Sequence, residues 1–99
     1  MNKFKSFLAP QLKKYVIYRH SLGYAMKASL SHLKTFDRYL MQKQAQQILL
    51  QPSFFIRMQA DLKIEARSAN NIIASVRVFF NYLVRTGAYS QNPLKDIAY

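Results

Sequence analysis

Apolar residues recur along this chain at the spacing of helices that bury one face. The clearest case lies between Ser68 and Gly87, where apolar residues fall at i, i+4, i+7, i+8 and i+11. We expect this helix to have Ser68 as its N-cap and to end at Gly87, because glycine readily takes the left-handed conformation that closes a helix. The residues expected to be buried are Ile72, Val76, Phe79, Phe80 and Leu83.

The same periodicity predicts three earlier helices. The first runs from about 10 to 22 and ends at Gly23, and the second runs from about 26 to 42. A polar loop over about 43–51 leads to a third helix that begins near Pro52, a residue suited to a first helical turn. The apolar positions expected to face the core are Leu8, Leu12, Tyr15, Val16 and Leu22 in the first helix, Met26, Leu30, Leu33, Phe36 and Leu40 in the second, and Phe55, Ile56, Met58, Leu62 and Ile64 in the third.

These elements predict an all-α protein, a four-helix bundle in a single domain of 99 residues. No segment shows the strict alternation of a half-buried strand. The bundle is expected over about 8–91, and 92–99 is expected to leave it, since Pro93 prevents the last helix from continuing. Leu94 and Ile97 are apolar enough to dock on the bundle.

The charge balance favours a polyanionic partner. Fifteen Lys and Arg stand against four Asp and Glu, a net charge of +11, while 51% apolar residues indicate a folded domain and not a disordered tail. This charge exceeds the roughly 2–8 that solubility requires. Nucleic acid is therefore favoured over an anionic membrane surface or charge for solubility alone, because cations that neutralise phosphates release condensed counterions.

The sequence also carries expectations about location and chemistry. There is no cysteine, so disulfides and thiolate sites are excluded. The lysine-containing N-terminus has no continuous apolar stretch of the kind that secretory signals contain, so we expect a cytoplasmic protein that is nucleoid-associated when bound to DNA.

Two of the predicted helices carry a polar face without acidic residues. For one helix alone, an ordinary solvated face is the simpler interpretation, but two such faces favour a shared binding surface for DNA. The polar positions are Lys27, Ser31, Lys34 and Arg38 in the second helix, and Asn70, Ala74, Arg77 and Asn81 in the fourth.

Several motifs occur in a characteristic order. KKYVIYR at 13–19 precedes SLGY at 21–24, LKTFDRYL follows at 33–40, SVRVFFNYL lies at 75–83, and Asn-Pro-Leu stands at 92–94. This combination, which covers nearly the whole chain, resembles the N-terminal core-binding domain of the tyrosine recombinases, the site-specific recombinases of phage-integrase type. The resemblance implies a SAM-like four-helix bundle that clamps the recombination core site, with a catalytic domain beyond 92–99.

The resemblance also implies roles for particular residues and partners. The expected partners are double-stranded DNA and other recombinase protomers on it, without membrane or small-molecule substrate. Asn71 stands where many relatives carry a basic residue. Arg77 has the alternatives of lying over Phe80 or pairing with an acid, and Tyr24 is expected to pack in the core rather than contact DNA. The implied DNA-binding residues are Lys27, Ser31, Lys34, Arg67, Ser68, Asn71 and Arg77.

No catalytic residue is expected in this chain. The arginines, lysine, histidines and nucleophilic tyrosine of the family belong to its catalytic domain, and none of the seven tyrosines, including Tyr99, stands in an Arg/His constellation. His20 and His32 are isolated from other metal ligands, so we expect no metal and no cofactor. The alternative function is a helical protein-interaction module with a basic surface and no DNA role. A set of membrane-surface helices is a weaker alternative.

Overall fold

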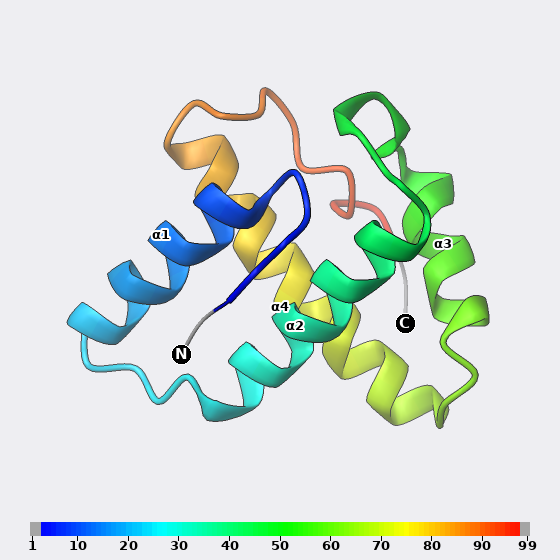
Figure 1. Cartoon of the computed structure of the whole chain (residues 1–99), viewed down its shortest axis with the longest axis horizontal. Helices are drawn as coiled ribbons and strands as arrows, with labels where there is room; N and C mark the ends of the chain where they lie inside the picture. The colour runs from blue at the N-terminus through cyan, green and yellow to red at the C-terminus, as the bar shows by residue number, and fades with distance from the viewer. Residues whose placement is uncertain (1–2, 98–99) are drawn as a thin grey trace.

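The computed structural model describes residues 3–97, apart from the side chain of Ile48, and consists of helices around one core (Figure 1). The prediction of an all-helical protein is confirmed, and no strand occurs within the described range. A short 3-10 helix, η1, lies in the loop that was expected between the second and third helices. The helices are α1 (Ala9–Ser21), α2 (Lys27–Gln42), η1 (Gln47–Leu49), α3 (Pro52–Asp61) and α4 (Ala66–Arg85).

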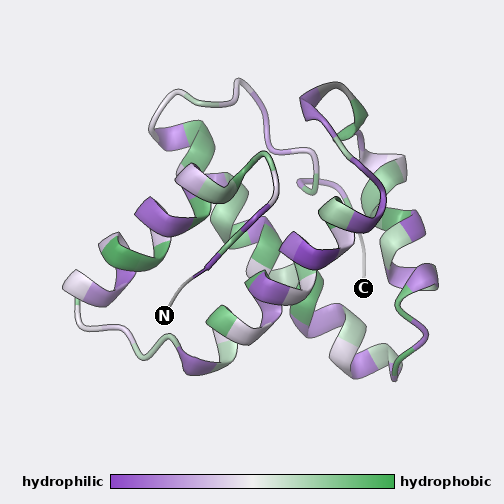
Figure 2. Ribbon diagram, in the orientation of Figure 1, coloured by the Kyte–Doolittle hydropathy of each residue, from purple (hydrophilic) through white to green (hydrophobic). Residues whose placement is uncertain are grey.

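The longest helix, α4, is the centre of the fold. It packs against α1, α2 and α3, and its most extensive contact is with α2, which crosses it in Figure 1. In this view α1 and α3 lie on opposite sides of the crossing. Hydrophobic and hydrophilic positions are interleaved along each helix, as expected for helices with one buried face (Figure 2).

Aromatic rings fill the space between these helices. Phe80 of α4 is fully buried, and its ring centroid lies 5.1 to 6.2 Å from those of Phe36, Phe55, Phe79 and Tyr89. All four contacts are edge-on, the arrangement that the charge distribution of aromatic rings favours. The five residues that the sequence placed on the buried face of α4 are all buried.

Local caps end three of the helices in the same way. Gly23 and Gly87 adopt φ angles of 88° and 85°, as the sequence predicted for the ends of α1 and α4. After α4 the Ala88 N–H donates to the Leu83 carbonyl at 2.9 Å, which satisfies one of the carbonyls left unpaired at the helix end. Gln44 closes α2 with a φ of 50°, and no glycine in the sequence signalled that stop.

The start of α4 differs from the prediction. The helix begins at Ala66, with the extended residue Glu65 as its N-cap, so Ser68 lies in the first turn and is not the cap. The Ala69 N–H donates to the Glu65 carbonyl at 3.0 Å and closes that turn. Ala66 and Arg67 are strong helix formers, which explains why the helix extends upstream of the serine.

Three apolar residues expected in the core are exposed instead. Leu22 is 56% exposed because it follows the end of α1, and Ile64 is 45% exposed in the turn between α3 and α4. Ile56 is 55% exposed because consecutive residues of a helix point in different directions, and the adjacent Phe55 takes the buried position.

Both terminal segments belong to the packed structure. Leu94 is fully buried and Ile97 nearly so, which confirms that they dock on the bundle. Phe4 packs against the same core from the N-terminal side. The core therefore extends beyond the expected bundle of 8–91, and residues 98–99 of the expected exit segment lie outside the described range.

Candidate nucleic-acid interface

The two helices that carry the predicted DNA-binding residues meet at a hydrogen bond. His32 Nδ1 of α2 lies 2.7 Å from Ser75 Oγ of α4, close to the point where the helices cross. The N-terminal ends of α2 and α4 both lie along the lower edge of the molecule in Figure 1. The sequence treated His32 as a surface or edge residue, although its i, i+4 relation to the buried Phe36 places it beside the core.

Two of the predicted residues on α4 lie on its edge beside α2. At 3.6 residues per turn, Ser68 and Asn71 fall within about 40° of Ser75 around the helix axis. Ser68 is half-buried and Asn71 is exposed. Arg67 is exposed as well, about 80° from Ser75 towards solvent. These three residues therefore share the N-terminal half of α4 and offer side-chain hydrogen-bond donors there.

The basic stripe of α2 remains on the surface. Lys27 and Ser31 are exposed, Lys34 is half-buried, and Arg38 continues the stripe as an exposed residue. The acid nearest to this stripe along the helix is Asp37, which is only 6% exposed. Its carboxylate is occupied by the backbone of another segment.

Asp37 fastens the N-terminal segment to α2. Its Oδ1 accepts the Ser6 N–H at 2.9 Å, and its two oxygens accept the Lys5 N–H at 3.2 and 3.0 Å. Hydrogen bonds from backbone amides to a buried carboxylate are among the stronger ones in proteins, since the acceptor is ionised. Asp37 therefore has a structural role that fixes the course of the chain before α1.

Arg77 holds the C-terminal segment against α4. Its Nε donates to the Leu94 carbonyl at 3.0 Å, and its guanidinium also donates to the Ile97 carbonyl. Asn92 adds to this contact by donating from Nδ2 to the Arg77 carbonyl at 3.0 Å and to Asn81 Oδ1 at 2.8 Å. The partners described for the Arg77 guanidinium are therefore backbone carbonyls of the C-terminal segment.

Arg77 also lies apart from the other predicted residues of α4. It is two residues after Ser75, which places it about 160° around the helix from that serine. Ser68 and Asn71 therefore border α2, whereas Arg77 borders the C-terminal segment. Its contact with DNA stays a prediction, and the guanidinium contacts indicate that its main role is to hold Leu94 and Ile97.

Tyr24 was expected to pack in the core, and this expectation is wrong. It is 51% exposed and does not pack in the core. The Arg19 guanidinium lies over its ring, with Cζ 4.0 Å from the ring centroid. This cation–π contact accounts for the position of Tyr24 after the end of α1.

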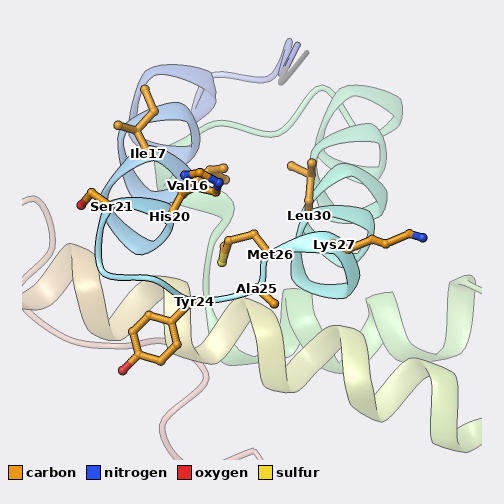
Figure 3. A pocket seen from close by; sticks show the side chains of 9 residues that line it. All are labelled: Val16, Ile17, His20, Ser21, Tyr24, Ala25, Met26, Lys27 and Leu30. Carbon is orange, nitrogen blue, oxygen red and sulfur yellow. The ribbon is translucent and has the colours of Figure 1, made fainter.

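An open groove lies between the end of α1 and the start of α2, with a volume of about 720 Å³ (Figure 3). Its lining is mostly apolar, and Ile17 and Tyr24 are more than half exposed there. Lys27 lies at the α2 side of the groove and His20 at the α1 side. The surface of the groove is therefore mainly apolar, and the Lys27 ammonium points away from the other lining side chains (Figure 3).

A polar contact joins α2 to the end of α3. The Tyr39 hydroxyl donates to Asp61 Oδ2 at 2.7 Å, and Lys43 Nζ lies 3.4 Å from the same oxygen. The hydrogen bond from Tyr39 is the main cause that lowers the pKa of Asp61, with Lys43 adding to it. Burial, followed by the bond to Asp61, raises the pKa of Tyr39 to about 12. No motif or spacing in the sequence indicated that these residues would pair.

The described residues form neither a cluster of metal ligands nor a helix that could cross a membrane. Within residues 3–97 no three His, Asp or Glu side chains come together as metal ligands. None of the helices in this range has the length and apolar character needed to cross a membrane. Comparison with protein-family models, curated proteins and solved structures found no match.

Proposed function

We propose that this chain is a DNA-binding module, the SAM-like core-binding domain of a site-specific tyrosine recombinase. The observation that carries the proposal is that α2 and α4 cross and that their N-terminal halves carry cationic and short polar side chains without an acid, in a protein with a net charge of +11. The ordered motifs that resemble the recombinases support the family assignment, and the four helices are compatible with it.

The proposed interface divides into two kinds of contact. Lys27, Lys34 and Arg67 carry the charges that neutralise phosphates, and such contacts supply affinity without sequence preference. Ser31, Ser68 and Asn71 carry short donors and acceptors that bond a phosphate oxygen or the edge of a base. The N-terminal halves of α2 and α4 would in this way approach neighbouring parts of the duplex together.

Salt dependence of duplex binding tests the DNA role. If about 4–6 phosphates are neutralised, log K should fall against log salt with a slope of about −4 to −5. Fluorescence anisotropy of a labelled duplex over a series of salt concentrations measures this slope. Binding that does not change between low and moderate salt contradicts the proposal.

A charge-matched pair of variants tests which surface binds. Lys27→Gln combined with Arg67→Gln removes two exposed cations at the ends of α2 and α4. We expect the slope to become shallower by about 1.8, because each lost phosphate contact removes about 0.9. The control, Lys14→Gln with Lys95→Gln, removes the same charge from exposed positions outside α2 and α4 and should keep the wild-type slope.

The family assignment has its own test. As the core-binding domain of a recombinase, this part of the protein holds DNA while a separate catalytic domain cleaves it through a phosphotyrosine link. The coding sequence that follows the Tyr99 codon should then contain the Arg…Lys…His-x-x-Arg…Tyr array of tyrosine recombinases. A stop codon or an unrelated domain there would leave DNA binding possible but would remove the recombinase role.

The alternative is a protein-interaction module, favoured by the open groove between α1 and α2. Its apolar lining suits a partner segment with apolar side chains. The face rich in phenylalanine does not serve this role, since Phe36, Phe55, Phe79 and Phe80 are fully buried. This alternative predicts that the wild-type domain shows no salt-dependent affinity for a duplex.

A further inference from the structure

The basic stripe of α2 extends onto the N-terminal segment, which lies along this helix. A groove of about 460 Å³ separates the two, and four cationic side chains line it together with one carboxylate. Two of these cations come from α2 and two from the segment before α1, more than 28 positions away in the sequence. The lining residues are Lys3, Lys5, Lys34, Asp37, Arg38 and Met41.

The position of the two N-terminal lysines follows from the anchoring of the residues around them. Phe4 is half-buried against the core, whereas Lys3 and Lys5 on either side of it are exposed. The backbone N–H groups of Lys5 and Ser6 are bound by Asp37, and Ser6 is itself buried. The segment is thus held at three successive residues, which keeps both lysine side chains beside α2.

The charges of this groove are not balanced within it. Four cations and one carboxylate leave a formal charge of +3. The carboxylate is that of Asp37, which already accepts three contacts from backbone amides and is buried away from solvent. Like charges gathered at one place repel each other, and an anionic ligand relieves that repulsion. The groove therefore favours a ligand with several negative charges.

We infer that this groove binds phosphates of the DNA backbone, with Lys3 and Lys5 as contacts beside Lys34 and Arg38. The inference rests on the proposed DNA-binding function and extends its surface beyond α2 and α4. Lys34 and Arg38 already belong to the acid-free stripe of α2, so the groove continues that stripe sideways onto the N-terminal segment. A phosphate chain that follows the stripe reaches both lysines without leaving the surface.

The test removes the two N-terminal charges and leaves the helices intact. In Lys3→Gln with Lys5→Gln, the slope of log K against log salt should become shallower by about 1.8 for a duplex of mixed sequence. Lys14→Gln with Lys95→Gln is the matched control, because it removes two lysine charges from exposed positions that do not line the groove. The control should keep the wild-type slope.

The possible results distinguish a failure of the groove proposal from a failure of the DNA-binding proposal. If the Lys3/Lys5 variant keeps the wild-type slope, or if the Lys3/Lys5 and Lys14/Lys95 variants become shallower by the same amount, the groove does not bind phosphates. The proposed DNA-binding function is then unaffected. A wild-type protein that does not bind duplex DNA overturns both.

Lysine acetylation of the wild-type protein, read by mass spectrometry with and without duplex, gives a second measurement that needs no variant. Lys3, Lys5 and Lys34 should be protected by the duplex and Lys14 should not. Uniform acetylation of all four lysines in the presence of bound DNA would contradict the groove.

Discussion

Helices α2 and α4 each use one charged side chain to hold a terminal segment, but with opposite chemistry. Asp37 of α2 accepts hydrogen bonds from the amides of Lys5 and Ser6, and Arg77 of α4 donates to the carbonyls of Leu94 and Ile97. A carboxylate suits free N–H groups and a guanidinium suits free carbonyls, because each satisfies backbone groups that lack a partner in a helix or sheet.

The N-terminal segment contributes positive charge to the surface, whereas the C-terminal segment contributes apolar side chains to the core. The N-terminal segment brings Lys3 and Lys5 to the basic stripe of α2, so its attachment adds charge to the proposed DNA surface. The C-terminal segment brings Leu94 into the core, so its attachment adds buried apolar area. A charged residue on a polar helix face can therefore serve structure as readily as binding, and the sequence pattern is the same in both cases.

The largest effect is expected from a change in the core on which both helices depend. Phe80→Ala should lower the free energy of unfolding by about 3–5 kcal/mol, since the ring is fully buried among four other rings. Urea denaturation followed by circular dichroism measures the change. Val78→Ala on the exposed side of the same helix is the control and should change stability by less than about 0.5 kcal/mol. Equal losses in the two variants would mean that the buried face of α4 is wrongly assigned.

Asp37→Ala tests the hydrogen bonds that hold the N-terminal segment against α2. The substitution leaves the Lys5 and Ser6 amides without their acceptor, and we expect a loss of about 2–4 kcal/mol in unfolding free energy. Asp96→Ala, at an exposed position, should have little effect. Hydrogen exchange of the Ser6 amide should accelerate in the Asp37 variant. Retained protection there would show that the segment is held by other contacts.

A comparison of Arg77→Ala with Arg67→Ala tests the hydrogen bonds that hold the C-terminal segment against α4. Arg77→Ala should cost about 1.5–3 kcal/mol of stability through the lost bonds to the Leu94 and Ile97 carbonyls. In the folded variant the salt slope of DNA binding should stay close to that of the wild type. Arg67→Ala should show the reverse, with stability unchanged within about 0.5 kcal/mol and a slope shallower by about 0.9. A slope change in the Arg77 variant would assign this residue to DNA as well.

The smallest effect concerns the Tyr39–Asp61 contact between α2 and α3. The pKa of Asp61 is lowered in the folded state, so its contribution to stability is present above the ordinary value of 3.8 and is lost as the pH falls through the lowered value. The pKa of Tyr39 is raised to about 12, so its contribution is present below pH 10 and is lost as the pH rises from 10 to 12. Tyr39→Phe should reduce both dependences, and its cost near pH 7 should be about 0.5–1.5 kcal/mol. Urea denaturation at several pH values checks this. An unchanged acid dependence in the variant would show that Asp61 does not depend on Tyr39.

Much of the fold was predictable because its determinants are local. The apolar spacing of α4 identified five of its seven buried residues and missed Ala69 and Ile73, and the two glycines identified where α1 and α4 end. Local rules were less successful at the ends of elements. Ser68 matched the chemistry of an N-cap, but the favourable residues before it allowed the helix to begin earlier.

The sequence by itself determined the helices, their buried faces and the excess of positive charge, because periodicity of 3.6 residues and composition are readable along the chain. Only the tertiary structure decided which charged side chains bind the terminal segments and which line a shared groove. Asp37 binds amides 31 and 32 residues away, and Arg77 binds carbonyls 17 and 20 residues away. Such pairings depend on how the helices cross, and this geometry cannot be predicted from the local sequence around a charged residue.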